Sequence, residues 1–305
     1  MRVLYVSPIE EDENPGIDML GHGLDHALAT AGIDMRVVVA DFRREDFVAG
    51  TAAAVEAGVA AGVDGIVLYT LAPDEPAAAV AAARAAGVPV FTFTRPRYPV
   101  DASLAYPNFN HGLYMADHLA TLVPRGAAVA VIPGPDVSDD TEEVIGILHG
   151  CDLHGLRVVN DVHDPRYRNA TDVEEGGHAA ALNVLADFPG LDALVPYNDE
   201  TMLGVLRALD EVGRPDGIRL LSRNGTPRAV ENVRAGRADG TWDLDPPGMG
   251  TALGALVVRQ VVGGERLDGE VGMSPVGRMI TRENADTWVP WERRIDVRPF
   301  RVGLD

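Results

Sequence analysis

Two short apolar runs between residues 191 and 250 each end at a polar turn that leads directly into a helical pattern. The run at residues 193–195 is followed by Asn198, and the run at residues 218–221 is followed by Asn224. Short, continuous apolar runs bounded by turn residues are typical of parallel strands buried on both faces. The two junctions therefore place Asn198 and Asn224 at the carboxyl edge of a parallel sheet, where open α/β sheets bind ligands.

The same alternation of strand and helix patterns runs through most of the 305 residues. It predicts βαβ units with right-handed crossovers and a parallel sheet. A stretch rich in proline and asparagine after Arg95 is interpreted as a passage between two domains, and residues 243–247 and 272–281 predict two more. The predicted fold is thus α/β, with two Rossmann-like, doubly wound lobes joined by a three-crossing hinge. We expect one lobe to comprise residues 1–102 and 246–274, and the other residues 103–245 and 275–305.

Composition excludes several classes of function. The net charge of −20 and the isoelectric point near 4.7 argue against nucleic acid as a partner, because nucleic acid favours a basic face. No apolar run approaches the roughly 18 residues that indicate a membrane span, so no direct membrane insertion is expected. All 26 basic residues are arginine, which excludes a Schiff-base lysine, a pyridoxal phosphate anchor and a Walker A lysine. With Cys151 as the single cysteine, no intrachain disulfide forms.

The stretch from residue 191 resembles the type I periplasmic binding proteins, specifically the ribose-binding-like sugar receptors of ABC importers. The family pattern there is roughly DAIFAANDEMALGALRAL…FDGTPEALEAI, and the resemblance extends from Val3 to about Asn284, short of the tail after Trp288. It implies a non-enzymatic receptor without a cofactor, whose lobes close on a small polar ligand such as a sugar, a polyol or a related metabolite. The implied partner is an ABC permease or a membrane sensor. The resemblance also places Cys151 in a solvated loop after a helix.

The resemblance further implies a set of ligand-binding residues. The family binds its ligand with an asparagine and aromatic residues after the first strand, an Asp-Arg pair after the fourth, and residues of the second lobe and the hinge. The matching positions here lack the family's aromatic faces, as at Ile17 and Thr171, and several of its charged contacts. Sugars pack their C–H faces on aromatic rings, so this loss indicates an altered ligand. The expected ligand-binding residues are Asn14, Ile17, Thr94, Arg95, Thr141, Asn198, Asn224 and Leu244.

Each of these positions also has a purely structural interpretation. An asparagine before proline, as at Asn14, is an ordinary turn residue. Arg95 offers a multi-donor fork for hydroxyls or a carboxylate, or pairs with an acid at the hinge. Near Thr141, Ser138 or Asp139 is expected to cap a helix. The Asp-x-Asp spacing of Asp243 and Asp245 does not require the two carboxylates to converge, so no metal site is expected.

Three other functions are alternatives. Regulators of the LacI type share the fold, but their helix-turn-helix and basic DNA face are absent here. An enzyme would rely on Asp243, Asp245 or a histidine, yet the sequence has no GxSxG, HExxH, Walker A or suitably placed GxGxxG motif. A cytoplasmic ligand sensor is the third. The chain begins with a strand pattern and no signal peptide, so we expect a periplasmic or extracellular protein, associated with the membrane through its permease, if a leader preceded Met1, and a cytoplasmic one otherwise.

Overall fold

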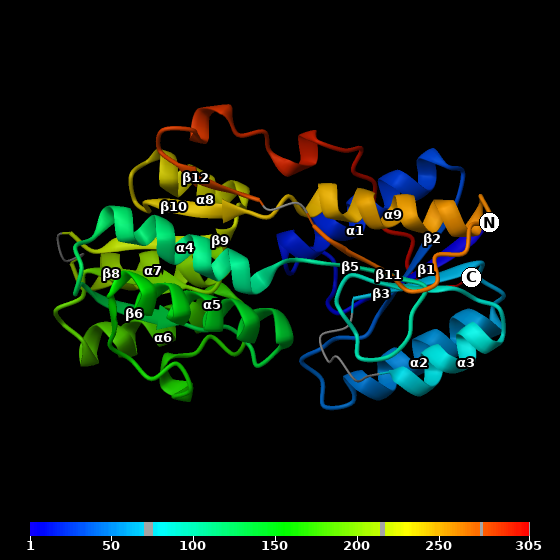
Figure 1. Ribbon diagram of the computed structural model, residues 1–305, viewed down its shortest axis with the longest axis horizontal. Helices are drawn as coiled ribbons and strands as arrows, with labels where there is room; N and C mark the ends of the chain where they lie inside the picture. Colours follow the sequence, from blue (N-terminus) through cyan, green and yellow to red (C-terminus); the bar gives the residue numbers. More distant parts are fainter. Residues whose placement is uncertain (70–75, 214–216, 275–276, 305) are drawn as a thin grey trace. The chain divides into compact units, whose positions relative to one another are not determined.

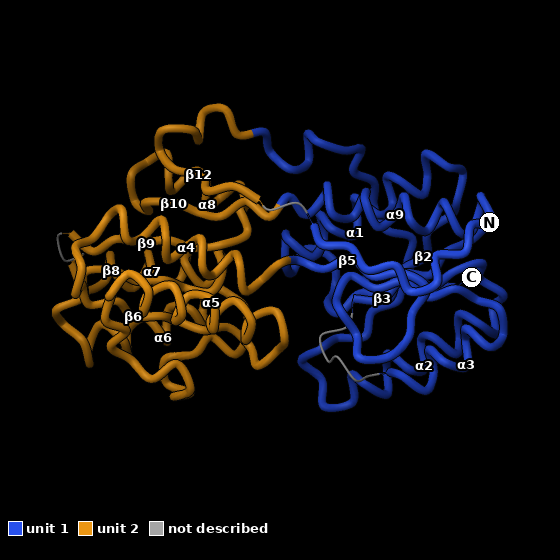
Figure 2. Tube along the Cα trace, in the orientation of Figure 1, with its two compact units in different colours: residues 1–106, 245–275, 289–305 blue, residues 107–244, 276–288 orange. Residues whose placement is uncertain are grey.

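The chain forms two compact units, shown in Figures 1 and 2. The structure, a computed structural model, describes residues 1–69, 76–213, 217–274 and 277–304. Unit 1 comprises Met1–Tyr106, Asp245–Pro275 and Val289–Asp305, and unit 2 comprises Pro107–Leu244 and Val276–Trp288. Each unit contains an α/β sheet of six strands within the described residues, all parallel except for one edge strand of unit 2. The predicted fold class of two doubly wound α/β lobes is confirmed.

The sheet of unit 1 has the strand order β11-β5-β4-β3-β1-β2. Figure 1 shows α1 and α9 covering one face of this sheet, with α2 and α3 on the other. Its strands are β1 (Arg2–Ser7), β2 (Asp34–Val39), β3 (Gly65–Leu68), β4 (Val90–Thr92), β5 (Ala102–Ala105) and β11 (Glu270–Met273). Its helices are α1 (Pro15–Thr30), α2 (Phe47–Ala60), α3 (Ala77–Ala85), α9 (Pro246–Val261) and the 3-10 turn η3 (Trp291–Arg293).

The sheet of unit 2 has the order β12-β10-β9-β8-β6-β7, in which β12 is antiparallel to β10. Helices α4 and α5 pack together, as do α6 and α7. The strands are β6 (Ala128–Ile132), β7 (Arg157–Val158), β8 (Ala193–Pro196), β9 (Arg219–Asn224), β10 (Gly240–Asp243) and β12 (Arg278–Thr281). The helices are α4 (Asn108–Leu122), α5 (Ser138–His154), α6 (Glu174–Asp187), α7 (Asp199–Glu211), α8 (Pro227–Arg234) and the 3-10 turns η1 (Pro165–Tyr167) and η2 (Ala285–Thr287).

Local sequence explains where several helices begin. At α1, Asn14 Oδ1 accepts hydrogen bonds from the Gly16 and Ile17 backbone, and Pro15 takes the first helical position, where its missing N–H costs nothing. At α8, Thr226 Oγ1 accepts from the Ala229 backbone N–H and Pro227 follows. Each of these helices follows a strand of its own sheet, α1 after a loop and α8 almost at once, so capping fixes polar side chains near the carboxyl edges of the sheets.

Glycines allow pairs of helices to pack with their backbones in contact. A Cβ on Gly250 of α9 would lie 2.0 Å from Leu20 O of α1, and a Cβ on Gly23 of α1 would lie 2.2 Å from Pro247 O. Gly112 and Gly146 play the same part between α4 and α5, where a Cβ on either residue would lie 2.1 Å from a carbonyl oxygen of the other helix. These contacts leave no space for a side chain, so the helix layers depend on glycine at these points.

The chain differs from expectation at the boundaries between units. It passes from one unit to the other at four places rather than three: after Tyr106, after Leu244, at residues 275–276, which lie outside the described residues, and after Trp288. The stretch interpreted as the first passage contains β5 and remains in unit 1 up to Tyr106. Its strand was missed because Ala102–Ala105 is too short and too weakly apolar to form a recognisable run.

The tail is the second difference. The sequence pattern assigned residues 275–305 to the second lobe, but residues 289–305 pack on unit 1. Val302 forms a parallel bridge with Val37 of β2, and the Phe300 ring stacks on His22 of α1 at 4.3 Å between ring centroids. Cys151 also differs from expectation, because it is buried inside α5 and not in a solvated loop.

The helix contact at Gly250 gives a stability prediction. We expect Gly250→Ala to lower the free energy of unfolding by about 1–3 kcal/mol, since the added methyl must push α1 and α9 apart. Gly50→Ala is the matched control, because the nearest atom to its Cβ position is 3.9 Å away and alanine favours the helix by about 0.5–1 kcal/mol. Urea titrations of both variants measure the difference. Equal stability of the two variants would contradict the packing described here.

Candidate functional site

The carboxyl edge of the unit 2 sheet carries two of the asparagines predicted from the sequence. Asn198 follows β8, Asn224 ends β9, and Leu244 follows β10. Asn198 and Asn224 are 2% and 9% exposed. Neighbouring parallel strands thus bring these residues to one edge, as the sequence predicted.

Asn198 is held at both ends of its amide. Its Oδ1 accepts from the Thr201 backbone N–H at 2.9 Å and from Thr201 Oγ1 at 2.8 Å, which caps α7. Its Nδ2 donates to Asp172 Oδ1 at 2.5 Å. These contacts fix the amide plane at the sheet edge, so the side chain is preorganised.

Asn224 lies beside the buried acid Glu200. It adopts a positive φ of 121° and donates from Nδ2 to Glu200 Oε2 at 3.2 Å. Burial raises the pKa of Glu200 to about 8, and the neighbouring Asp172 and Asp199 carboxylates raise it further in the same direction. Asn198 with Asp172 and Asn224 with Glu200 are therefore two hydrogen-bonded pairs of an amide and an acid, and the charge of Asp172 acts on Glu200.

Asp199 joins the elements beneath these pairs. Its carboxylate is fully buried and accepts hydrogen bonds from Ser222 Oγ of β9, from the Thr226 backbone N–H at 2.7 Å and from Thr241 Oγ1 of β10 at 2.7 Å. Burial raises the pKa of Asp199 to about 6, although these hydrogen bonds oppose the shift. One side chain thus fixes the start of α7 to two strands and to the start of α8.

A buried ion pair lies on the opposite face of β9. Arg223 is 4% exposed and Glu143 of α5 is fully buried, with Arg223 Nε 2.9 Å from Glu143 Oε2. Arg223 also donates to Asn108 Oδ1 at 2.9 Å, and its guanidinium lies 5.0 Å from the centre of the Tyr197 ring. Alternation along the strand explains this placement, since Ser222 and Asn224 face α7 and Arg223 therefore faces α4 and α5.

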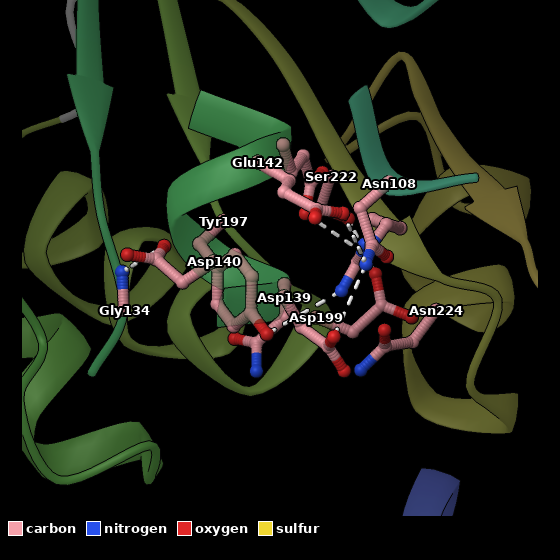
Figure 3. A network of polar contacts seen from close by, with 12 residues as sticks. Asn108, Gly134, Asp139, Asp140, Glu142, Tyr197, Asp199, Ser222 and Asn224 are labelled. Carbon is pink, nitrogen blue, oxygen red and sulfur yellow. Dashed lines mark hydrogen bonds and ion pairs between the residues drawn. The ribbon is translucent and has the colours of Figure 1, made fainter. Parts of the chain in front are cut away.

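Asn108 extends this contact to the start of α5, as Figure 3 shows. Its Nδ2 donates to Asp139 Oδ1 at 3.1 Å and to Glu142 Oε2 at 3.4 Å. The expected capping of α5 by Ser138 or Asp139 is not observed, because Val137 occupies the N-cap position without a side-chain bond. Asp139 instead accepts a hydrogen bond from Asn108, so the acidic first turn of α5 is part of the polar network at the carboxyl edge of the sheet.

The remaining predicted residues of unit 2 are less suited to polar recognition. Thr141 is exposed in the first turn of α5. Leu244 is buried and offers its backbone N–H to Asn224 O at 3.1 Å, so its side chain adds only apolar surface. Thr171 is exposed and donates to Asn169 Oδ1, while the nearby Tyr167 is buried in the core.

The carboxyl edge of unit 1 carries the other predicted residues. Asn14 is 4% exposed with its Oδ1 engaged in capping α1, so the structural interpretation of this oxygen holds; Ile17 is half-buried one turn further on. Thr94 is buried after β4, whereas Arg95 is exposed. Among the described residues no ion pair joins Arg95 to an acid, so its alternative interpretation as a paired hinge arginine is not observed.

Sequence reasoning missed several residues that the structure brings to these edges. In unit 1, Tyr69 follows β3, and its ring lies 6.2 Å from Phe93, which provides aromatic surface at an edge expected to lack it. In unit 2, Asn108 and Arg223 belong to the polar network, and Trp242 of β10 stacks with Tyr114 at 5.6 Å. The period-two alternation of β9 was the available signal for Arg223. Asn108 had none, because its partners are distant in sequence.

No metal centre is apparent in the part of the chain that the structure describes, where no three His, Cys, Asp or Glu side chains gather closely enough. Asp243 accepts from Trp288 Nε1 at 2.9 Å, and Asp245 accepts from Arg294 NH1 at 2.7 Å. The Asp-x-Asp pair therefore has two different partners. The described residues also include no helix with the length and apolar character needed to cross a bilayer.

The Arg223–Glu143 pair gives a second stability prediction. Arg223→Met leaves the Glu143 carboxyl buried without its partner, so we expect a loss of about 3–5 kcal/mol in the free energy of unfolding. Arg228→Met is the control, because its exposed pair with Glu174 is worth about 1 kcal/mol or less. Chemical denaturation measures both. The double variant Arg223→Met/Glu143→Leu should recover most of the lost stability. If Arg223→Met alone costs no more than Arg228→Met, the buried ion pair does not stabilise the fold as described.

The raised pKa of Glu200 gives a pH prediction. Between its ordinary value of 4.5 and about 8, the folded state holds a proton that the unfolded state has lost. This group therefore makes the free energy of unfolding fall as the pH rises from 5 to 8, by roughly 4 kcal/mol at most. Glu200→Gln should remove this slope, and the exposed Glu231→Gln should leave it unchanged. Denaturant titrations at both pH values measure the slope, and identical slopes in all three proteins would contradict the burial argument.

The sequence is similar to those of known binding proteins. The ribose import binding protein RbsB of Bacillus subtilis (strain 168) is 25% identical over 236 residues, which is 76% of this chain and 73% of that protein. RbsB of Salmonella typhimurium is 29% identical over 192 residues, and the match spans 62% of each chain.

Solved structures share the fold. A periplasmic solute binding protein from Actinobacillus succinogenes 130z with bound D-allose has a TM-score of 0.83 at 20% identity, covering 94% of this chain and 99% of that one. A Caulobacter myo-inositol binding protein has a TM-score of 0.79 at 19% identity, covering 94% of each chain. The family model described as a periplasmic binding protein domain matches residues 5–265. The chain therefore belongs to the periplasmic binding protein family, in agreement with its type I fold and its ribose-binding relatives.

Proposed function

We propose that the protein is a solute receptor that binds a small polyhydroxy molecule, a sugar or a polyol, for ABC-type import. The family consists of binding proteins, and the chain is accordingly a binding protein and not an enzyme. The named relatives are ribose import binding proteins, and the named structures hold D-allose and myo-inositol. Ribose, allose and inositol share closely spaced hydroxyls that act as both donors and acceptors.

The single observation that carries the proposal is the fixed arrangement of these two pairs at the edge of unit 2. Asn198 and Asn224 present amides beside the Asp172 and Glu200 carboxyls, all held by the contacts described above. Amides and a protonated carboxyl group such as that of Glu200 both donate and accept, and a carboxylate accepts, so this set matches neighbouring hydroxyls. Its preorganisation limits the entropy that binding costs.

Unit 1 supports the same ligand class from its own edge. Arg95 is exposed and offers five N–H donors in a planar fork, which suits adjacent hydroxyl oxygens. Tyr69 is half-buried and supplies an aromatic ring on which a sugar C–H face packs. In the proposed receptor, a ligand that contacts both lobes favours the closed state.

The partner and the location are part of the proposal. Binding proteins of this family deliver ligands to a membrane transporter, and we propose a permease of the ABC type as the partner, with the receptor outside the cytoplasmic membrane. The relatives named above are import binding proteins, and none of them is a regulator. No observation favours the regulator or the cytoplasmic sensor, so neither is proposed.

A thermal unfolding screen tests the ligand class. A ligand that binds only the folded state raises the midpoint of unfolding as its concentration exceeds the Kd. Pentoses, hexoses, inositols and small carboxylates form the panel. We expect a concentration-dependent shift with at least one sugar or polyol, while a shift confined to carboxylates would refute a polyhydroxy ligand.

Arg95 provides the residue-level prediction. We expect Arg95→Met to weaken binding of the identified ligand by about tenfold or more, the loss of roughly one strong charge-assisted interaction, without changing the midpoint of the ligand-free protein. Arg157→Met is the matched control, since Arg157 is also exposed but starts β7 at the amino edge of its sheet. Calorimetric titration gives both Kd values. Equal affinity of the two variants would remove Arg95 from the site.

A further inference from the structure

The fourth passage between the units lies outside the segment that matches the family. The family model ends at residue 265, and the fourth passage follows Trp288. The chain enters unit 2 with β12, which pairs with β10 in a register that sets Arg278 opposite Asp243. After the turn η2 it returns to unit 1 as residues 289–305. This protein therefore has one more covalent connection at its hinge than the sequence predicted.

The unit 2 end of the fourth passage is anchored to the end of β10. Trp288 is 4% exposed, and its indole Nε1 donates to Asp243 Oδ2 at 2.9 Å. The preceding turn is also held, because Ala285 is fully buried and its carbonyl accepts from Arg234 NH2 at 2.6 Å. Trp288, the last residue of unit 2, is therefore held in a defined position.

The unit 1 end is anchored to the start of α9. Arg294 NH1 donates to Asp245 Oδ1 at 2.7 Å, and Arg294 Nε donates to Val289 O at 2.9 Å. Between them, Trp291 is only 1% exposed. Residues 288–294 are thus fixed at both ends within seven residues.

The two anchors bind residues on either side of the second passage between the units. Asp243 and Asp245 flank Leu244, after which the second passage occurs. Trp288 therefore binds Asp243, on the unit 2 side of the second passage. Arg294 binds Asp245, on its unit 1 side. The Asp-x-Asp pair thus supplies one carboxylate to each anchor.

We propose that residues 288–294 act as a splint across the second passage, which limits the range of lobe positions in the ligand-free protein and thereby sets ligand affinity. The effect on affinity rests on the receptor function proposed above. The restriction of movement does not, because it concerns the ligand-free chain.

The physical reason lies in how hinges move. A hinge rotation is absorbed by φ and ψ changes in a few residues, such as Asp245 with its φ of 51°. With a second segment fixed on both sides, the same rotation must also change residues 289–293, where Pro290 locks one φ angle. Releasing an anchor widens the range of lobe positions that the ligand-free chain samples. It therefore lowers the fraction of molecules able to close, and the apparent Kd rises.

Distance measurements by double electron–electron resonance test the splint in the ligand-free protein. Spin labels are attached at Ala57→Cys of α2 and Ala186→Cys of α6, both exposed, in a Cys151→Ala background. Arg294→Met removes one anchor, and Trp288→Phe removes the indole N–H of the other. Arg293→Met is the matched control, because it is the exposed neighbour in the same turn. Arg294→Lys keeps the cation beside Asp245.

We expect Arg294→Met and Trp288→Phe to broaden the distance distribution by about 1.5-fold, with Arg293→Met and Arg294→Lys close to the parent protein. The apparent Kd for the ligand found in the panel should rise about threefold to tenfold in the two anchor variants. If the distance distributions of Arg294→Met and Trp288→Phe are both as narrow as that of Arg293→Met, the splint is refuted. If no panel compound binds the parent protein, the receptor function fails, while the distance distributions still decide the splint.

Discussion

The buried Asp199 carboxylate is the contact on which the edge of unit 2 depends. It accepts from Ser222 of β9, Thr226 at the start of α8 and Thr241 of β10, and it stands in the first turn of α7. A carboxyl group buried this deeply is stable only when its oxygens are bonded. Because these bonds reach two strands and two helix starts, the positions of Asn198 and Asn224 are fixed together.

Capping and recognition share the same side chains at these edges. Asn14 and Asn198 each use the amide oxygen to cap a helix, so their functional and structural interpretations are not exclusive. A helix that begins where a parallel strand ends needs a capping side chain there, and the sheet brings several such side chains to one edge. Beside Asn224, the raised pKa of Glu200 gives the edge of unit 2 a charge that varies with pH.

Sequence patterns were sufficient for the fold class and for placing Asn198 and Asn224, because buried parallel strands and their turns are local signals. They were insufficient where long-range contacts decide. Arg223 joins Asn108 and Glu143 from two other helices, and Tyr69 meets Phe93 from another strand. The tail was misassigned because its partners, His22 and Val37, lie more than 250 residues earlier. The fourth passage between the units was not predicted for the same reason.

Hydrogen–deuterium exchange with and without a bound sugar or polyol tests the central claim, that the ligand occupies the carboxyl edges of the two sheets. Local protection reports where a ligand suppresses opening of the backbone. We expect protection in the segments at residues 14–18, 94–97, 197–201 and 223–227, which carry the proposed contacts. Protection confined to another surface, such as the pocket of unit 1 lined by Arg84, Asp101 and Gln260, would contradict the account.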